Sequence, residues 1–253
     1  MTRGSNPRGP TLLDMIVEYC KKRLGELTLK LFQDVVLKAK TIGLGTGSTV
    51  KHVVDYMVVK HVLDGKLLYA SSYDTKHYLL KYGYRSLTPR DGLPEEIDVY
   101  VDGFDEVSLK LDMVKGRGGA LLWEKQLASR SRVRIYVGDY TKFNNKPHLY
   151  LKPIPVEVRV DRVMDVYSVF EKHGFKPRIR MGSGKDGPII TDPGNFIIDI
   201  KPGVIRDPRG FNEFIKNIEG VLDTGVFTSD LVDYVLLTGF HSNSVMVVAN
   251  VQR

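Results

Sequence analysis

The sequence has a single cysteine and no long apolar run, and each shortage excludes a class of protein. One cysteine among 253 residues cannot form an internal disulfide, and the apolar helix positions around Cys20 predict that it packs in the core. The longest apolar stretches fall far short of the roughly 20 residues that cross a bilayer. The first ten residues, MTRGSNPRGP, do not resemble a secretory signal. We therefore expect a soluble, cytoplasmic protein without a membrane partner.

Motifs for metals, nucleotides and covalent nucleophiles are also missing. The six histidines form no H-x-H or H-E-x-x-H group, so the usual metal-ligand spacings are absent. The sequence has no G-x-S-x-G elbow for a serine nucleophile. It completes neither G-x-x-x-x-G-K-[ST] nor G-x-G-x-x-G, the two common nucleotide motifs. These absences predict chemistry that uses no metal, and they give no support for a dinucleotide or ATP site.

Basic residues outnumber acidic ones, but without a pattern. Lysine and arginine number 37 against 30 aspartates and glutamates, a formal charge of +7. The basic residues are scattered, and no zinc-finger or RNA-binding signature accompanies them. A small anionic substrate explains this balance as well as a polyanion does. We therefore expect no nucleic-acid partner.

The first part of the chain has the pattern of a parallel α/β sheet. Thr11 opens a stretch whose apolar residues recur at helical spacing. They are Leu13, Ile16, Val17, Cys20, Leu24, Leu27 and Leu31. Short β-rich segments then alternate with helix-like stretches, at residues 41–45, 66–71, 97–102 and 133–138. Such alternation predicts a parallel sheet covered by helices on both faces.

The pattern changes after Pro153 to the order βαββαβ, which is typical of a ferredoxin-like unit. The expected elements are a strand at 156–160, a helix at about 163–173, strands at 177–181 and 196–200, a helix at about 211–218 and a strand at 221–227. Strands at 234–237 and 245–249 are expected to return to the first sheet. We expect a flexible tail at 1–10, a catalytic domain at 11–152 plus 228–253, and an inserted domain at 153–227.

Two aspartates follow the apolar strand expected at residues 97–101, in the segment VDGFDE. Asp102 and Asp105 would lie at the carboxyl end of that strand, where α/β sheets usually place their chemistry. Like charges held close raise the pKa of one carboxyl group, which suits general acid-base catalysis near neutral pH. An isolated D-G-x-D is more often a turn whose aspartates cap backbone N–H groups. The case for catalysis therefore depends on the neighbouring segments.

Those segments supply a cation, free amides and a third carboxylate. Lys115 begins KGRGGA, whose glycine loop leads into a helix expected at 120–127. The free N–H groups of this loop and the N-terminus of the helix would then face the same point, where they could stabilise an anion. Glu124 falls about one turn into that helix, where partial burial would raise its pKa and make it a competent carbon-acid base. Alone, Glu124-Lys125 would be an ordinary exposed helix pair; beside this loop, Glu124 is the candidate general base.

A second glycine loop follows the first expected strand, in TIGLGTGST at residues 41–49. Its N–H groups and hydroxyls can hold a phosphate at a helix N-terminus, and its alternate glycines allow a ligand to approach the backbone. The competing interpretation makes Ser48 or Thr49 a simple helix cap. Together the two loops predict an enzyme that acts on a small phosphorylated metabolite.

Six segments, in order, resemble type A ribose-5-phosphate isomerases over nearly the whole chain. They are TIGLGTGSTV, YVDGFDEV, KGRGGALLWEK, the lysine of GDYTKF, PIPVEV and TDPGNFIIDI. The resemblance implies an α/β fold with a Rossmann-like parallel sheet and an inserted ferredoxin-like α+β domain, in a homodimer or homotetramer. It also implies cofactor-free interconversion of ribose 5-phosphate and ribulose 5-phosphate through an enediolate, in the non-oxidative pentose phosphate pathway.

The resemblance further implies a role for each matching residue. Glu124 would move a proton between C2 and C1, and Asp102, with Asp105 beside it, would assist ring opening and handle hydroxyl protons. Lys115 and the amides of residues 116–118 would stabilise the developing oxyanion. The implied substrate-binding set is Thr46, Gly47, Ser48, Thr49, Gly103, Phe104, Gly116, Arg117, Gly118, Lys142 and Lys22. Lys22 is chosen over Lys21, which fits almost as well.

Three residues depart from the pattern of this family. Phe104 stands where alanine is usual, Trp123 where arginine is usual, and Pro193 where asparagine is usual. Bulk at 104 would narrow the cleft, and loss of a cation at 123 would alter the pKa of Glu124 or a subunit contact. We expect these changes to affect rate and substrate preference more than reaction type.

Two other functions fit the same scaffold. A non-catalytic sugar-phosphate-binding regulator would be expected to lose part of the acid-base set, all of which is present here. A related sugar-phosphate deaminase or CoA transferase is the other alternative. The lack of a well-placed histidine weighs against the deaminase.

Overall fold

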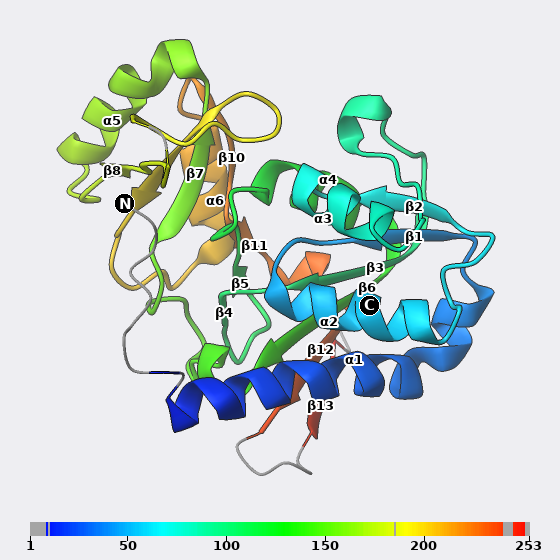
Figure 1. Ribbon diagram of the computed structural model, residues 1–253. Helices are drawn as coiled ribbons and strands as arrows, with labels where there is room; N and C mark the ends of the chain where they lie inside the picture. Colours follow the sequence, from blue (N-terminus) through cyan, green and yellow to red (C-terminus); the bar gives the residue numbers. More distant parts are fainter. Residues whose placement is uncertain (1–8, 10, 185, 240–244, 251–253) are drawn as a thin grey trace.

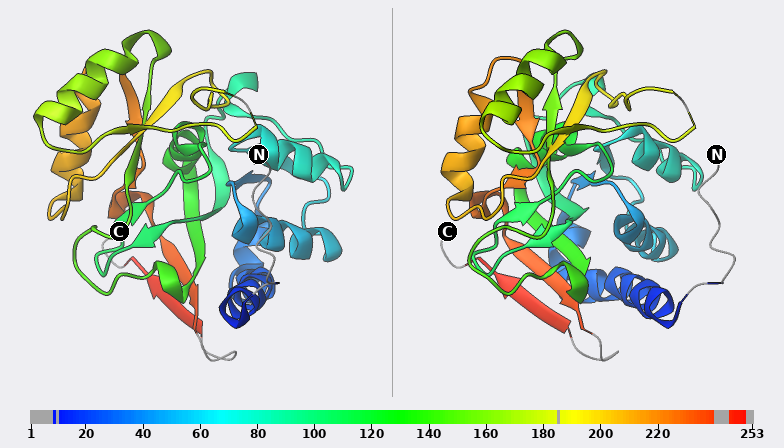
Figure 2. Two further views of the ribbon diagram at one scale, coloured as in Figure 1. Left: turned by 60° about the vertical axis from the view of Figure 1, so that its left-hand side comes forward. Right: turned by 90° about the vertical axis from the view of Figure 1, so that its left-hand side faces the viewer.

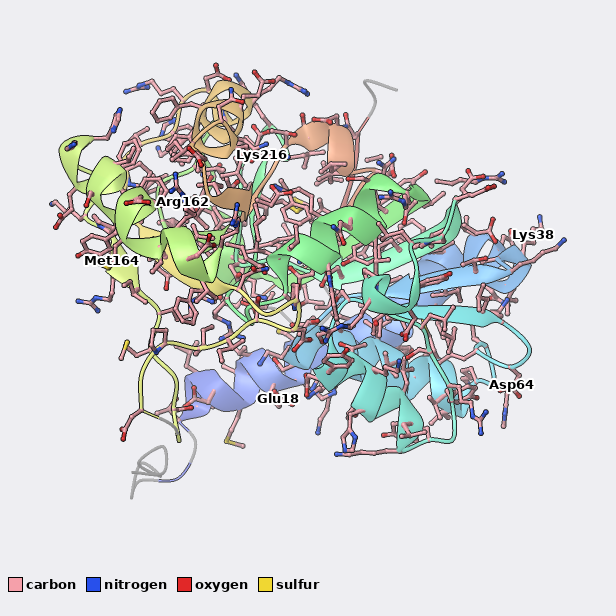
Figure 3. All side chains as sticks on the ribbon, turned by 90° about the horizontal axis from the view of Figure 1, so that it is seen from above. Glu18, Lys38, Asp64, Arg162, Met164 and Lys216 are labelled. Carbon is pink, nitrogen blue, oxygen red and sulfur yellow. The ribbon has the colours of Figure 1, made fainter. Side chains whose placement is uncertain are left out.

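The computed structural model describes residues 9, 11–184, 186–239 and 245–250. Two units are visible in Figure 1, a larger sheet with its helices and a smaller unit that carries α5 (Val163–Lys172) and α6 (Pro208–Lys216). Seen from above, Met164 and Lys216 on these two helices lie on the side of the molecule opposite Lys38 (Figure 3). The flexible tail predicted at residues 1–10 lies, apart from Gly9, outside the described residues.

The larger sheet has six strands in the order β13-β12-β6-β3-β1-β2. They are β1 (Thr41–Leu44), β2 (Leu67–Ala70), β3 (Ile97–Gly103), β6 (Ser131–Asp139), β12 (Tyr234–Thr238) and β13 (Val245–Ala249). Neighbouring strands are parallel except β12 and β13, which pair in antiparallel register. The predicted parallel sheet and the return of the last two strands to it are therefore confirmed.

Helices cover both faces of this sheet, as predicted. The helices α1 (Leu12–Lys38), α2 (Ser48–Val59) and α3 (Tyr73–Leu80) share one core with the sheet, and α4 (Leu121–Ser129) packs on the other face. Strand β3 supplies both cores because its side chains alternate: Val99 and Val101 face the first core, and Tyr100 faces the second. In the described part of the chain, none of the helices combines the length and apolar character needed to cross a bilayer.

The first helix begins where predicted, but its apolar stripe is only partly buried. Thr11 caps α1 in a reciprocal bond with Asp14, and Cys20 is buried as expected. Leu13 and Leu31, predicted to face the core, are 53% and 49% exposed. The reason is that α1 packs closely on α2 at Gly25, where an added Cβ would lie 2.4 Å from the carbonyl oxygen of His52. The buried face follows this contact and not the leucine spacing.

The smaller unit has the predicted element order βαββαβ. Its strands are β7 (Ile154–Val158), β8 (Arg178–Ile179), β9 (Phe196–Ile200) and β10 (Val221–Thr224), arranged β10-β7-β9-β8. The helices α5 and α6 cover the outer face of this sheet (Figure 2), and α4 contacts its other side. Lys125 of α4 reaches across, with Nζ 2.6 Å from Asp223 Oδ1 and 2.7 Å from the carbonyl oxygen of Thr224. The domain boundaries at 153 and 227 stay a prediction.

The single strand predicted at residues 221–227 is wrong, because Gly225 divides it. After β10, the short strand β11 (Val226–Phe227) leaves for a separate sheet with β5 (Met113–Val114) and β4 (Glu106–Val107). The N–H of Gly225 donates to Pro155, and its carbonyl accepts from the N–H of Lys115 at 2.8 Å. A Cβ at 225 would lie 2.2 Å from the Lys115 carbonyl oxygen, so only glycine permits this crossing.

Strand order also fixes where ligands meet the sheet. The chain moves from β1 outward to β2 and then returns to β3 on the other side of β1. Loops that follow β1 and β3 therefore separate in opposite directions and leave a crevice at the carboxyl ends of the strands. The glycine loops of TIGLGTGST and KGRGGA, described in the sequence analysis, both contribute residues to this crevice.

Candidate active site

A small pocket lies where the loops after β1 and β3 meet the start of α4. It is lined by Thr46, Gly47, Ser48, Thr49, Val50, Gly103, Phe104, Asp105, Lys115, Gly116, Arg117, Gly118, Glu124 and Lys142. A cleft of about 1140 Å³ adjoins it and shares Ser48, Asp105, Arg117 and Lys142 with it. The structure thus brings together every predicted site residue except Lys22. Asp102 does not line the pocket surface but contacts Lys115 directly beneath it.

A buried ion pair forms the floor of the pocket. Nζ of Lys115 lies 2.7 Å from Oδ2 of Asp102 and donates to the carbonyl of Gly103 at 2.5 Å. Both charged side chains are almost completely buried, at 2% and 0% exposure. Burial opposes the charged form of Lys115, but the carboxylates of Asp102 and Glu124 outweigh it and raise the pKa of Lys115. Lys115 is therefore a fixed cation.

Asp102 is held by several donors besides Lys115. The hydroxyl of Tyr100 donates to its Oδ2 at 2.6 Å, and the N–H groups of Gly103 and Thr46 donate to its Oδ1 at 2.6 and 3.2 Å. A Cβ at Gly45 would lie 1.8 Å from Oδ1, so glycine there makes room for the carboxylate. Sequence reasoning missed Tyr100, although side chains two residues apart on a strand share a face, which was the available signal.

Glu124 supplies a buried carboxylate from α4. It is 3% exposed, and its Oε2 lies 3.3 Å from Nζ of Lys115 without forming a hydrogen bond. Burial, then the charge of Asp102, raise the pKa of Glu124 to about 8, against the opposing effect of Lys115. The like-charge effect predicted within the aspartate pair therefore acts on Glu124. Such a carboxylate can accept a proton near neutral pH.

The loop between β5 and α4 turns tightly around its glycines. Gly116 and Gly119 have φ of +94° and +81°, and an added Cβ at 116 would lie 2.7 Å from Cβ of Leu121. The N–H of Arg117 donates to Oδ2 of Asp105 at 3.0 Å. This bond links the loop to the turn after β3 and fixes Asp105 at the edge of the pocket.

The N-terminus of α2 opens into the same pocket. Gly47, with φ of +126°, occupies the cap position, and no side chain caps the helix. The interpretation of Ser48 or Thr49 as a simple cap is therefore wrong. First-turn amides of such a helix can bind an anion. The hydroxyl of Thr46 points to the other side of the loop, 2.8 Å from that of Ser71, so it anchors the loop.

Two of the unusual residues occupy different places. Phe104 is 2% exposed and lines the pocket, with Nζ of Lys142 5.6 Å from its ring centroid. Burial lowers the pKa of Lys142. Trp123 is buried away from the pocket, in edge contact with Tyr73 of α3 at 5.5 Å. Phe104 thus shapes the pocket, as expected, whereas Trp123 packs one helix against another.

The choice of Lys22 over Lys21 is not supported by their positions. Lys21 lines the larger cleft, with Nζ 3.4 Å from Glu18. Lys22 is exposed on α1 and lines neither the pocket nor the larger cleft. The structure therefore places Lys21, and not Lys22, beside the site.

Comparisons with known proteins agree with this geometry. The family model for ribose 5-phosphate isomerase A (phosphoriboisomerase A) matches residues 67–241. Ribose-5-phosphate isomerase A of Archaeoglobus fulgidus is 36% identical over 211 residues, 82% of this chain and 91% of the relative. A solved D-ribose-5-phosphate isomerase in complex with phospho-erythronic acid matches with a TM-score of 0.81 and 31% identity, covering 92% of this chain and 99% of that one. For the ribose 5-phosphate isomerase from Plasmodium falciparum the TM-score is 0.80, with 30% identity and the same coverage.

Proposed function

The chain belongs to the ribose 5-phosphate isomerase A family and is an aldose-ketose isomerase, and we propose that Glu124 is the general base of its reaction. The reaction interconverts D-ribose 5-phosphate and D-ribulose 5-phosphate. One observation carries the proposal for the base: Oε2 of Glu124 is buried, forms no hydrogen bond and belongs to a residue that lines the pocket. Because its pKa is raised to about 8, this carboxylate is basic enough to remove a proton next to a carbonyl group.

The proton transfer follows from this placement. Glu124 removes the proton on C2 of the open-chain aldose, and an enediolate forms as the electron pair moves toward the C1 oxygen. Lys115, a permanent cation 3.3 Å from Glu124, stabilises the negative charge that develops on the oxygens, together with the loop amides of Gly116 and Gly118. Protonated Glu124 then returns the proton to C1, and the O2 proton moves to O1, which yields the ketose.

The two aspartates receive different proposed roles. Asp105 lines the pocket and is fixed by the N–H of Arg117, so it is placed to handle sugar hydroxyl protons during ring opening. Asp102 is fully buried and already accepts from Tyr100 and Lys115. Its role in this proposal is to hold Lys115 and to raise the pKa of Glu124, which makes it a positioning residue.

Substrate binding is proposed for the opposite side of the pocket. Ser48, at the start of α2, and Lys142 line both the pocket and the larger cleft, and Lys21 lines the larger cleft. An anionic phosphate would gain from both the helix N-terminus and the cations. The relative bound to phospho-erythronic acid supports an acidic sugar phosphate as the ligand class.

A homodimer or homotetramer and a cytoplasmic location remain part of the proposal, as does chemistry without a metal. The deciding experiment follows ketose formation by the purified protein with ribose 5-phosphate and other aldose phosphates, with and without a chelator. We expect conversion of ribose 5-phosphate at an unchanged rate in chelator. Binding of the sugar phosphate without turnover would instead favour the regulator.

A further inference from the structure

Arg180, just after β8 in the smaller unit, reaches the glycine loop of the active site. Its Nη1 donates to the carbonyls of Gly116 and Arg117, at 2.9 and 3.0 Å. The contact spans 64 residues of sequence to Gly116, and neither glycine motif of the site contains this arginine. It is therefore a direct bond between the two units at the edge of the pocket.

The guanidinium of Arg180 is fixed from its other side. Nε donates to Oδ2 of Asp199 in β9 at 2.8 Å, and Nη2 pairs with Oδ1 of the same carboxylate. A planar guanidinium held by two bonds to a carboxylate has a defined orientation, which lysine would not reproduce. The remaining N–H groups of Arg180 are thus aimed at the loop.

The bonds to the two carbonyls set the direction of two amides. A peptide unit is planar and trans, so the N–H of Arg117 points away from the Gly116 carbonyl, and the N–H of Gly118 away from the Arg117 carbonyl. The first of these N–H groups donates to Asp105 at 3.0 Å. The second has no acceptor within the described part of the chain, and Gly118 lines the pocket.

We propose that Arg180 is a positioning residue for the isomerisation: by holding the carbonyls of Gly116 and Arg117, it aims the N–H of Gly118 at the developing oxyanion and the N–H of Arg117 at Asp105. This inference deepens the proposed function and rests on it. The positive guanidinium also polarises the two peptide units, which strengthens their N–H donors. Arg180 acts from the smaller unit, through the two carbonyls that it holds.

The test separates rate from binding in Arg180→Ala. Misaligned donors affect the transition state more than the ground state, so kcat should fall about 10- to 100-fold while KM changes less than about threefold. Affinity for phospho-erythronic acid, whose carboxylate carries a negative charge, should fall with kcat, whereas affinity for inorganic phosphate should not. Added guanidinium ion should restore part of kcat in Arg180→Ala and none in Glu124→Gln.

Two further variants complete the experiment. Arg206→Ala removes an exposed cation from the smaller unit that lines neither the pocket nor the larger cleft, so it reports the effect of lost charge alone and should retain most of kcat. Asp199→Asn keeps the volume and loses the ion pair, so it should lower kcat in the same direction even if Arg180→Ala does not fold. If the wild type is active and both Arg180→Ala and Asp199→Asn keep kcat within about twofold of it, the inference is overturned while the isomerase function stands. An inactive wild type would contradict the proposed function itself.

Discussion

The ring of Phe104 fills the space that a side chain at position 138 would need. A Cβ built on Gly138 would lie 2.5 Å from Cζ of Phe104, far closer than van der Waals contact. Phe104 lies after β3 and Gly138 near the end of the adjacent strand β6, so the two backbones cannot separate. The phenylalanine at the pocket is thus matched by the absence of a side chain on the neighbouring strand.

This match predicts a strong coupling between the two positions. Gly138→Ala alone should destabilise the fold by about 1–3 kcal/mol through overpacking and lower kcat/KM, because the displaced ring lines the pocket. Phe104→Ala alone should cost about 3–5 kcal/mol as a buried aromatic side chain is lost. In the double variant the new methyl group occupies part of the vacated space. The double variant should therefore be more stable than the sum of the two single effects predicts. Urea unfolding of the four proteins measures the coupling, and additive effects would contradict it.

Replacement of the proposed base gives the most direct prediction. Glu124→Gln keeps the shape of the side chain but cannot accept the C2 proton, so kcat should fall by about 10²–10⁴ or more. The circular dichroism spectrum should be unchanged. Glu95→Gln, at an exposed position remote from the pocket, is the matched control and should behave as wild type. Full activity in Glu124→Gln would remove Glu124 from its role.

The pH dependence of the reaction should follow the ionisation of this carboxyl group. Glu124 must be unprotonated to act, and its pKa is raised to about 8. In the free enzyme kcat/KM should therefore rise about tenfold per pH unit below that value and level off above it. Stopped assays between pH 5.5 and 9.5 measure the profile. A flat profile over the whole range would mean that burial does not raise this pKa in the free enzyme.

Stability should change with pH in the opposite direction. Between the ordinary glutamate value of 4.5 and about 8, the folded protein holds a proton on Glu124 that the unfolded chain has released. This contribution to the free energy of unfolding is present in full below about pH 4.5 and is lost as the pH rises through about 8. Glu124→Gln cannot ionise and should gain stability relative to wild type between pH 5 and 9. Denaturant titrations at pH 5, 7 and 9 compare the two proteins, and a constant difference would refute the linkage.

Loss of Lys142 should affect binding before chemistry. This lysine lines both the pocket and the larger cleft, so Lys142→Ala removes a cation near the substrate anion and should raise KM more than it lowers kcat. Lys146→Ala, an exposed lysine nearby in the chain, controls for the general loss of positive charge. Equal KM values for the two variants would count against a role for Lys142 in binding.

The pocket could be predicted because most of its residues lie in short motifs at strand ends. Strand periodicity placed Asp102 and Asp105 at the carboxyl end of β3, and topology then brought the glycine loops together. Spacing alone could not choose between Lys21 and Lys22. Successive residues of a helix point about 100° apart, and the rotation of α1 is set by its contact at Gly25.

The sequence contains no local motif for residues that contact the pocket loops from a distant part of the chain. Arg180 follows the two-residue strand β8, and the groups that it positions are backbone carbonyls, which every residue has whatever its side chain. The division of the expected strand at Gly225 also had no local signal, because apolar residues lie on both sides of that glycine. Such features depend on which segments meet in space, and only the assembled structure shows them.

Glu124 and Lys125 are consecutive residues of α4, yet the first lines the pocket and the second is bonded to Asp223 in the smaller unit. A chimaera that took its four-stranded unit from a relative without a carboxylate at position 223 would therefore keep the motifs of the pocket and still lose the anchor of the helix that carries the proposed base. The orientation of the helix that carries the proposed base thus depends on a carboxylate in the other unit.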